Sequence, residues 1–245
     1  MTQLFTRNQM KYALSNPTTS TDVGLGLYRQ GYREFGIEYW GIDAASEVKY
    51  FLDHIVDRES LPELTMLDIA AGTGKNVLEF ARLSVKHAHA VEIDSIGTLH
   101  LLKALVSLEE AKLLPENRVT VVKDDAIHFL QHHTAQYDIV VCYGLLHVFK
   151  DPDYLKNAIS LIKKSVVAGG YLILQAITDK YPAPAIQPEL EGVIVNAQTF
   201  SDNFQSPKWL TIHVDDKDIS HSHSGSEEHH KHGSIRIILQ KSYET

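Results

Sequence analysis

The chain has 245 residues, of which 44% are apolar, and its formal net charge at pH 7 is −8. This length suits one domain with a large core, and the composition excludes disordered and collagen-like classes. The negative charge repels phosphate backbones and so disfavours a nucleic-acid partner. No apolar run approaches the roughly 18 residues that span a bilayer, so we expect no membrane partner. The single cysteine, Cys142, fits a reducing compartment, and we expect a cytoplasmic protein.

The first part of the chain, residues 1–58, is interpreted as an N-terminal helical cap or lid. It contains an aromatic-rich stretch in which Tyr28 and Tyr32 lie on one side of a predicted helix. These two side chains could cover a bound ligand, or they could pack the helix on the rest of the domain. Asp43 is expected to cap a second helix over residues 44–56.

Strands and helices then alternate along the chain. Short apolar runs predict strands at 64–70, 88–93, 119–122, 137–142 and 171–175. Helical periodicity predicts helices at 77–85, 99–106, 127–132 and 152–167. This alternation favours a parallel sheet with helices on both faces. Two further strands, 208–214 and 234–240, follow without a helix between them and predict a terminal antiparallel hairpin.

These elements predict one α/β domain with a doubly wound, mostly parallel sheet of seven strands. Besides the cap, its parts would be a cofactor-binding core at 59–176, a substrate-side insertion at 177–208 and the C-terminal strands at 209–245. In a sheet of this kind, ligands bind at the carboxyl ends of the strands. Candidate functional residues are therefore those that directly follow a predicted strand.

The most informative segment, residues 67–76, predicts a buried strand, a turn of small residues and the start of a helix. Small residues let a ligand approach the backbone, and a helix N-terminus offers free N–H donors. A phosphate-binding P-loop is rejected because Ile69 replaces its first glycine and Asn76 replaces its hydroxyl residue. A dinucleotide fingerprint is weakened by Val77, where a small residue is needed, and by Asp68, which would oppose a pyrophosphate.

The same segment, Asp68-Ile-Ala-Ala-Gly72-Thr-Gly74, resembles the first motif of the class I S-adenosylmethionine-dependent methyltransferases, with Ala70 in place of an earlier glycine. Further segments resemble later motifs of that family in the same order: residues 91–94, 124–126, 137–147 and 168–174. The resemblance covers roughly residues 64–175. The Trp209 strand and the residues after it are loosely similar to the tail of tellurite-resistance-type methyltransferases. The family implies a Rossmann-like fold.

The resemblance also implies the cofactor, S-adenosyl-L-methionine, which leaves as S-adenosyl-L-homocysteine. Asp68 would suit the amino group and sulfonium of this cofactor. Asp94 is expected to take the ribose hydroxyls, with Glu92 as a close rival, and Asp125 to lie beside the exocyclic amine of adenine. The acid at the end of the second strand and Asp125 could each instead cap the helix that follows. The implied cofactor-binding residues are Asp68, Ala70, Gly72, Thr73, Gly74, Asn76, Asp94, Asp125, Ala126 and Tyr143.

Methyl transfer is an in-line displacement, so the enzyme must align the acceptor with the methyl group and exclude water. Tyr143 and His147 follow the fourth strand of the core and are the candidate catalytic residues. His147 could accept a proton from the acceptor, or it could be a histidine held in a packed segment. Gln175, after the fifth strand, is a candidate for a substrate hydrogen bond, and Thr178 is a weaker one.

A histidine-rich stretch joins the last two predicted strands. Strand alternation places His221 and His223 on one face, and His230 and His232 on one face of the returning strand. The stretch could be a solvated hairpin, a loop that faces the substrate through His221 and His223, or a metal site. None of these histidines has the spacing of a helix-borne metal motif, so we assign no metal.

We therefore expect transfer of a methyl group from S-adenosylmethionine to an O, N or S atom of a small molecule. Tyr28 and Tyr32 would also lie on the substrate side. Two alternatives stay open. One is a cofactor-binding protein without methyl transfer, whose histidine-rich stretch binds a metal or a partner. The other is an NAD(P)-dependent oxidoreductase. The sequence assigns no oligomeric state.

Overall fold

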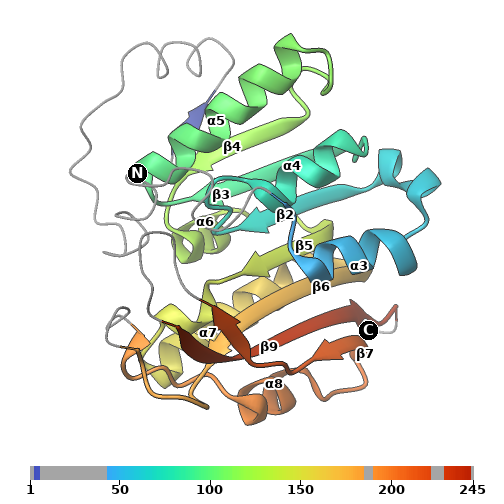
Figure 1. Cartoon of the computed structure of the whole chain (residues 1–245). Coiled ribbons are helices and arrows are strands. Elements are labelled where there is room, and N and C mark those ends of the chain that lie inside the picture. The colour runs from blue at the N-terminus through green and yellow to red at the C-terminus, as the bar shows by residue number, and fades with distance from the viewer. Residues whose placement is uncertain (1–2, 6–42, 185–189, 222–228, 244–245) are drawn as a thin grey trace. The chain divides into compact units, whose positions relative to one another are not determined.

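The computed structural model describes residues 3–5, 43–184, 190–221 and 229–243. The chain divides into two compact units, Met1–His133 and Thr134–Thr245, and the strands and helices of each can be followed in Figure 1. Tyr28, Tyr32 and most of the expected N-terminal cap lie outside the described residues. The division of the chain into cap, core, insertion and C-terminal strands stays a prediction.

The first unit is built on a sheet in which three parallel strands lie side by side. The strand order is β1-β4-β3-β2, and β2, β3 and β4 are parallel as predicted. β1 pairs with β4 in the antiparallel direction and was not predicted, because three residues are too few to show a periodic pattern. The strands are β1 (Gln3–Phe5), β2 (Thr65–Ile69), β3 (His87–Glu92) and β4 (Val119–Lys123).

Each pair of neighbouring parallel strands in this unit is joined through a helix. α4, α5 and α6 pack against the sheet, and each begins within a few residues of the carboxyl end of a strand. The helices are α3 (Ser46–His54), η2 (Arg58–Glu63), α4 (Lys75–Arg82), α5 (Ser95–Glu110) and α6 (Ala126–His132). None of the helices in the described part of the chain is long and apolar enough to cross a membrane.

The start of α3 corrects one prediction. Its N-cap residue is Ala45, and Asp43 does not cap it. The Asp43 carboxylate instead lies 3.2 Å from Nζ of Lys49 at the surface. The backbone N–H of Ala45 donates to Oδ1 of Asn76, at 2.9 Å, which lies at the start of α4. A side chain 31 positions away therefore anchors this helix, and local sequence patterns cannot show such a contact.

The second unit combines one parallel strand pair with antiparallel strands at the C-terminus. The strand order is β5-β6-β9-β7, with β5 and β6 parallel. β9 runs antiparallel to β6, β7 and β8, so the predicted antiparallel ending is confirmed, and β8 is an additional short strand. The elements are β5 (Tyr137–Tyr143), η3 (Leu146–Val148), α7 (Pro152–Lys164), β6 (Val166–Thr178), α8 (Ala197–Phe204), β7 (Trp209–Asp215), β8 (Ile219–His221) and β9 (His230–Lys241).

The boundary between α7 and β6 also differs from the prediction. The helix was expected to reach residue 167, but it ends at Lys164, and β6 begins at Val166. Val166 lies opposite Tyr137 of β5, whose N–H donates to the carbonyl of Ser165 at 2.8 Å. A β-branched residue at this point favours the strand, and pairing with β5 outweighs the apolar periodicity that continues from the helix.

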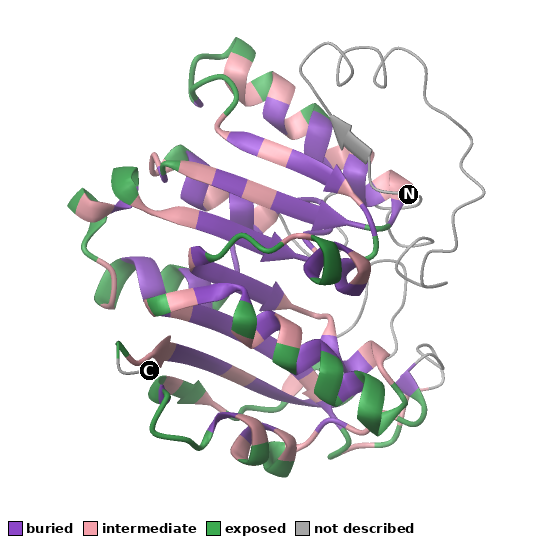
Figure 2. Ribbon diagram, turned by 180° about the vertical axis from the view of Figure 1, so that it is seen from behind, coloured by how far each residue is buried: buried purple, intermediate pink, exposed green. Residues whose placement is uncertain are grey.

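The strands β2, β3, β4, β5, β6 and β9 are mostly buried (Figure 2), whereas most of β7 is exposed. In the first unit, Leu67 of β2, Phe80 of α4 and Leu101 of α5 are fully buried. Burial of a side chain of this size contributes about 1.5 to 3 kcal/mol relative to the exposed state. The apolar contacts between these helices and strands therefore hold in place the turns at the strand ends.

The turn between β2 and α4 depends on a glycine at its last position. Gly74 is the N-cap of α4 and has φ +86°, a left-handed conformation that residues with a Cβ rarely adopt. A Cβ atom at this position would lie 2.2 Å from Cδ1 of the buried Leu101. Glycine is therefore needed here both for the backbone conformation and for the close approach of α5.

Replacing Gly74 should destabilise the protein by more than backbone strain alone explains, because the added Cβ would also clash with Leu101. We expect G74A to cost about 1 to 3 kcal/mol more than a matched change, G192A, in the free energy of unfolding. Gly192 also has a positive φ, +70°, but a Cβ there would meet no atom within 4 Å. Thermal or urea unfolding of both variants measures the difference. Equal losses of stability in the two variants would show that the Leu101 side chain can move away from the added Cβ at no cost in the free energy of unfolding.

Candidate functional site

The loop after β2 turns the chain from the strand into α4. Ala70, Gly72 and Gly74 all have left-handed backbone conformations, with φ of 57°, 58° and 86°. The N–H of Ala71 donates to the carbonyl of Val91 in β3, and the N–H of Gly74 donates to the carbonyl of Ala71, both at 2.9 Å. The first hydrogen bond ties the loop to the neighbouring strand, and the second closes the turn on which α4 begins.

Asp68 provides a buried carboxylate at the base of this loop. Its side chain is 1% exposed, and Oδ2 accepts a hydrogen bond from the N–H of Val77 at 3.1 Å. Its Oδ1 has no hydrogen-bond partner in the described part of the chain. Burial raises the pKa of Asp68 to about 7, although the hydrogen bond from Val77 lowers it. An acceptor oxygen that is buried without a partner is costly, so this atom fits a ligand that brings a donor or a positive charge.

Glu92 joins the end of β3 to the loop. Its Oε2 accepts from the N–H of Gly72 at 2.6 Å, and its Oε1 accepts from the N–H of Asp94 at 2.7 Å. The side chain is buried, and burial raises its pKa to about 7 against the opposing effect of these hydrogen bonds. Glu92 therefore holds the loop after β2 in place. The sequence had considered it only as an alternative to Asp94 for binding the ribose hydroxyls.

Asp94, in contrast, caps the helix that follows β3. Its Oδ1 accepts from the N–H groups of Ile96 and Gly97, at 2.8 and 3.0 Å, at the start of α5. The sequence had left capping open as the alternative to ribose binding, and capping is what the structure contains. A ribose contact by Asp94 stays a prediction.

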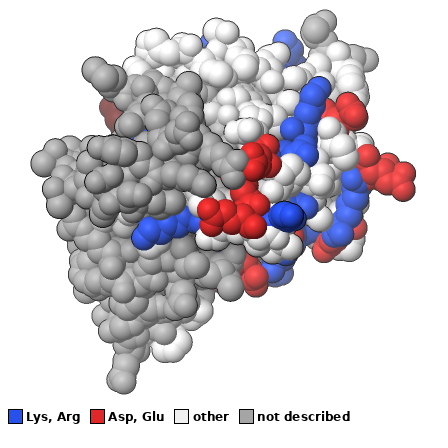
Figure 3. All heavy atoms as spheres, turned by 90° about the horizontal axis from the view of Figure 1, so that it is seen from above, with Lys and Arg blue, Asp and Glu red and all other residues white. Residues whose placement is uncertain are grey.

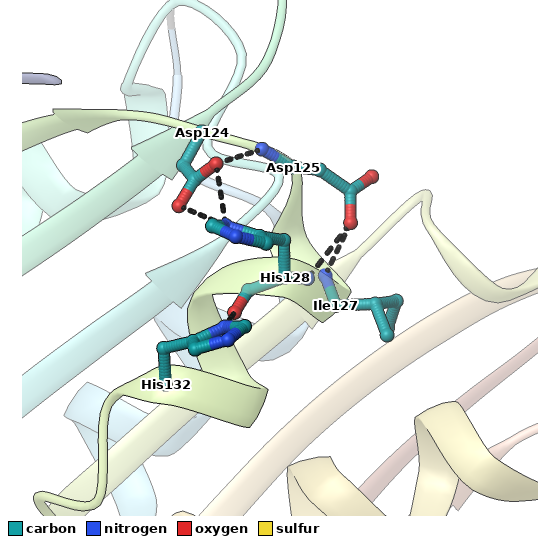
Figure 4. Close-up of polar contacts among 5 residues, drawn as sticks. All are labelled: Asp124, Asp125, Ile127, His128 and His132. Carbon is teal, nitrogen blue, oxygen red and sulfur yellow. Dashed lines mark hydrogen bonds and ion pairs between the residues drawn. The ribbon is translucent and has the colours of Figure 1, made fainter. Parts of the chain in front are cut away.

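A turn with two acidic residues follows β4 (Figure 4). Oδ1 of Asp125 accepts from the N–H groups of Ile127 and His128, both at 2.9 Å, and so caps α6. The buried carboxylate of Asp124 accepts from the N–H of Asp125 at 2.9 Å and from Nδ1 of His128 at 3.0 and 2.9 Å. The sequence alone gave no role to His128, because a histidine on a helix face carries no specific signal.

The three strand ends of this unit are connected to one another. Glu92 accepts from Gly72 through its side chain and from the N–H of Asp124 through its backbone carbonyl, at 3.2 Å. Because β2, β3 and β4 are parallel neighbours, their carboxyl ends lie at one edge of the sheet. The structure therefore brings together the acidic and glycine residues that the sequence assigned to the cofactor in this unit.

Three other residues of the predicted cofactor set have different surroundings. Asn76 is buried, and its side-chain oxygen is engaged by the N–H of Ala45. Thr73 is buried within the loop, and Ala126 is buried as the first residue of α6. Their contacts with a cofactor stay predictions.

In the second unit, His147 is buried in η3 beyond the end of β5. Only 2% of its surface is exposed, and its Nδ1 accepts a hydrogen bond from the N–H of Ile177 at 3.3 Å. Burial, together with the nearby Lys150 and His232, lowers the pKa of His147 to about 3. The ring is therefore neutral near pH 7 and carries its proton on Nε2. These features favour the interpretation of a histidine held in a packed segment over that of a general base.

Tyr143 and Gln175 lie at the ends of the parallel pair β5 and β6. Tyr143 is partly buried, and the N–H of the following Gly144 donates to the carbonyl of Gln175 at 3.1 Å. Gln175 is buried, and its Nε2 donates to Oγ of Ser234 in β9 at 3.1 Å. Thr178, the last residue of β6, is also buried.

The histidine-rich stretch is partly described. His230 and His232 are buried on β9 with their ring centroids 4.7 Å apart, as expected for alternate residues on one face. His221 lies in β8 opposite His230, and His223 lies outside the described residues. Among the residues that the structure describes, no group of three or more His, Cys, Asp or Glu side chains could hold a metal ion.

Comparison with known proteins gives one family match and several solved structures with a similar fold. Residues 66–170 match a family model described as a methyltransferase domain. TehB from Haemophilus influenzae is 16% identical with a TM-score of 0.64, over 86% of this chain and 67% of that one. A SAM-dependent methyltransferase from Methanosarcina mazei is 16% identical with a TM-score of 0.57, over 82% of this chain and 100% of that one. No curated protein matches the chain.

A third solved structure is similar over 90% of this chain and 94% of its own, with 16% identity and a TM-score of 0.61. It comes from work on the conversion of a disulfide bond into a thioacetal group during echinomycin biosynthesis. At these identities the likeness shows the fold, which is α/β and Rossmann-like, with a mostly parallel sheet and antiparallel C-terminal strands. The fold predicted from the sequence is thereby confirmed.

The buried His147 predicts that acid destabilises the protein. Its pKa is 6.5 in the unfolded chain and about 3 in the folded protein, so the unfolded chain binds the proton first. Its contribution is fully present above pH 6.5 and is lost as the pH falls toward 3, by up to about 1.4 kcal/mol per pH unit. In H147Q, which cannot titrate, the melting temperature should fall less steeply between pH 6.5 and 4.

The matched control is H54Q, because His54 is exposed. Its pH dependence should follow that of the unmodified protein. Parallel melting curves for all three proteins would mean that His147 is not held neutral in the folded state.

Proposed function

We propose that this chain is a class I S-adenosylmethionine-dependent methyltransferase that methylates an O, N or S atom of a small molecule; the match of residues 66–170 to a methyltransferase domain model supports the proposal. The cofactor is S-adenosylmethionine, which supplies an electrophilic methyl group when bound. The residues that would bind this cofactor belong mainly to the first unit, and those that would receive the acceptor belong to the second.

Asp68 supports the assignment of the cofactor's methionine end to the loop after β2. Its Oδ1 is buried without a described partner, and its high pKa reflects the cost of a charge at that place. A cationic amino group would meet this oxygen and offset that cost. The backbone of Ala70, Gly72, Thr73 and Gly74 would line the same loop, because small residues in left-handed turns let a ligand approach the backbone closely.

The adenosine end would fall to the acids after β3 and β4. Between the two candidates for the ribose hydroxyls, the contacts favour Glu92, which is bonded to the loop itself, over Asp94, which caps α5. Asp125 would accept from the exocyclic amine of adenine through Oδ2. Its Oδ1 is used by the helix cap, and no described residue engages Oδ2. Ala126 would pack beside the ring.

The observation that carries the acceptor class is a group of buried polar side chains around the end of β6. His147, Gln175, His232 and Ser234 are each at most 5% exposed. Enclosed polar groups suit the few polar atoms of a small molecule, whereas a macromolecule needs a broad exposed surface. The net charge of −8 agrees with this. On the face drawn in Figure 3, acidic and basic side chains of the described residues are interspersed and form no continuous basic surface.

Within this proposal, Tyr143 and His147 would orient the acceptor. The lone pair of His147 Nδ1 is engaged by Ile177, so the neutral ring carries its proton on Nε2 and acts there as a donor. Such a donor positions an acceptor atom but does not remove its proton. Methyl transfer gains mainly from alignment and exclusion of water, so an acceptor with a free lone pair needs no base.

The direct test is formation of S-adenosylhomocysteine from S-adenosylmethionine in the presence of acceptor panels. Small thiols, phenols and amines form one panel, and bulk tRNA, rRNA and mixed proteins form the other. We expect turnover with a member of the first panel and none with the second. Turnover with a macromolecule alone would overturn the acceptor class. A melting temperature that rises with NAD(H), but with neither S-adenosylmethionine nor S-adenosylhomocysteine, would support the oxidoreductase alternative.

Asp68 allows a prediction in which affinity and stability change in opposite directions. D68N keeps an oxygen for the N–H of Val77 but loses the charge, so the dissociation constant for S-adenosylmethionine should rise roughly 10- to 100-fold. The pKa of Asp68 is raised, so its contribution to stability is present below pH 3.8 and lost as the pH rises through about 7. The cofactor-free D68N protein should therefore melt higher than the unmodified protein at pH 8.

The pH dependence of binding tests the same point. The ionised carboxylate binds the cation, so the advantage of the unmodified protein over D68N should grow as the pH rises through about 7 and then level off. Calorimetric titration of both proteins from pH 6 to 9 measures this ratio. A ratio that stays constant would place the amino group elsewhere.

Two amide substitutions decide between the acids after β3. D94N preserves a good helix cap, because asparagine caps as well as aspartate. If Glu92 binds the ribose, E92Q should weaken cofactor binding roughly tenfold or more, while D94N should change it less than threefold. The reverse order would restore Asp94 as the ribose ligand.

A further inference from the structure

We infer that His128 is a positioning residue for adenine recognition, acting through Asp124 on the turn that carries Asp125. This inference rests on the proposed function, because it presumes that Asp125 meets the adenine amine. The contacts among Asp124, Asp125, Ile127 and His128 that support it lie in the turn between β4 and α6 and are drawn in Figure 4.

The first observation is the position of the Asp124 carboxylate between a ring and a backbone amide. Asp124 is 7% exposed, and both of its oxygens lie within hydrogen-bond distance of Nδ1 of His128, at 3.0 and 2.9 Å. Oδ1 also accepts from the N–H of Asp125 at 2.9 Å. A carboxylate accepts only, so Nδ1 of His128 must be the donor. The ring therefore holds the side chain that in turn holds the backbone of Asp125.

The second observation is that His128 contacts the turn twice. Its backbone N–H donates to Oδ1 of Asp125, together with the N–H of Ile127. Its ring donates to Asp124. The cap and the ring contact together fix the direction in which Oδ2 of Asp125 points. A change of the side chain alone removes the ring contact and leaves the cap in place, so the two effects can be separated.

The third observation is the difference in burial between His128 and Asp124. The His128 side chain is 44% exposed, whereas that of Asp124 is 4% exposed. If the His128 ring is removed, the buried carboxylate of Asp124 loses a hydrogen-bond donor, and fewer donors then satisfy its two oxygens. Asp124 also donates its N–H to the carbonyl of Glu92, so its backbone is held on one side. When the ring is lost, we therefore expect the backbone to shift at Asp125 and not at the end of Asp124 that is bonded to Glu92.

The consequence is specific to the adenine ring. A displaced Oδ2 would weaken the hydrogen bond to the exocyclic amine and leave the methionine end of the ligand untouched. The ratio of affinities for S-adenosylhomocysteine and S-inosylhomocysteine reports this bond, because the second ligand has a carbonyl in place of the amine. A residue that only stabilised the fold would weaken both ligands alike and leave the ratio unchanged.

The test measures the dissociation constants of both ligands by calorimetry on the full chain. H128A should bind S-adenosylhomocysteine roughly 5- to 30-fold more weakly and lose most of its preference over S-inosylhomocysteine. H128N should restore both to within about threefold, since its amide nitrogen takes the place of Nδ1. H132A is the matched control and should leave both constants unchanged. The ring of His132 donates to the backbone carbonyl of His128, and its centroid lies 4.4 Å from that of the His128 ring. No dashed line joins the His132 ring to either acid in Figure 4, so H132A removes a neighbouring ring without removing a contact of Asp124 or Asp125.

The outcomes separate this inference from the proposed function. If the unmodified protein binds neither ligand, the proposed function fails and the inference falls with it. If it binds both, and H128A keeps the full preference for the adenine ligand, the inference alone is overturned. The same holds if H128A weakens both ligands equally and H128N restores neither. Should H128A not fold, D124N serves in its place and must narrow the preference for the inference to stand.

Discussion

Two buried carboxylates at the ends of parallel strands impose the constraint on which the cofactor region depends. Asp68 and Glu92 are both almost fully buried, and burial raises the pKa of each to about 7. Such groups are costly unless hydrogen bonds or charges satisfy them. Glu92 is satisfied by backbone amides, including that of Gly72, and so organises the loop. Asp68 keeps one oxygen without a described partner and so favours a cationic ligand.

The histidines show how environment assigns different roles to one residue type. His147 is enclosed, neutral near pH 7 and engaged at Nδ1 by a backbone N–H, which suits a donor better than a proton acceptor. His128 is half-exposed and donates to a buried carboxylate, which suits a positioning residue. His230 and His232 are buried in contact with each other on β9. Burial and the identity of the hydrogen-bond partner thus decide what each imidazole can do.

The two units carry different shares of the proposed chemistry. The strand ends of the first unit hold acids and left-handed glycine turns, which the proposed function assigns to the amino, ribose and adenine groups of the cofactor. The second unit holds buried polar side chains around the end of β6. The adaptable part of such an enzyme is the acceptor side, and the fold alone names no acceptor. The acceptor class therefore rests on the side chains of the second unit and on the net charge.

The sequence by itself determined the elements and the loop, because both are local. Short apolar runs and helical periodicity located most of the strands and helices, and Asp68, Gly72 and Gly74 lie within seven residues of one another. Only the tertiary structure decided between Asp94 and Glu92 as the acid that is bonded to the loop, since the contact of Glu92 with Gly72 joins residues 20 positions apart. The same is true of the partner of His147, 30 positions away in β6, and of the anchor of α3 at Asn76. Contacts between distant residues leave no periodic trace in the sequence, so the role of such a side chain becomes visible only when the strands are assembled.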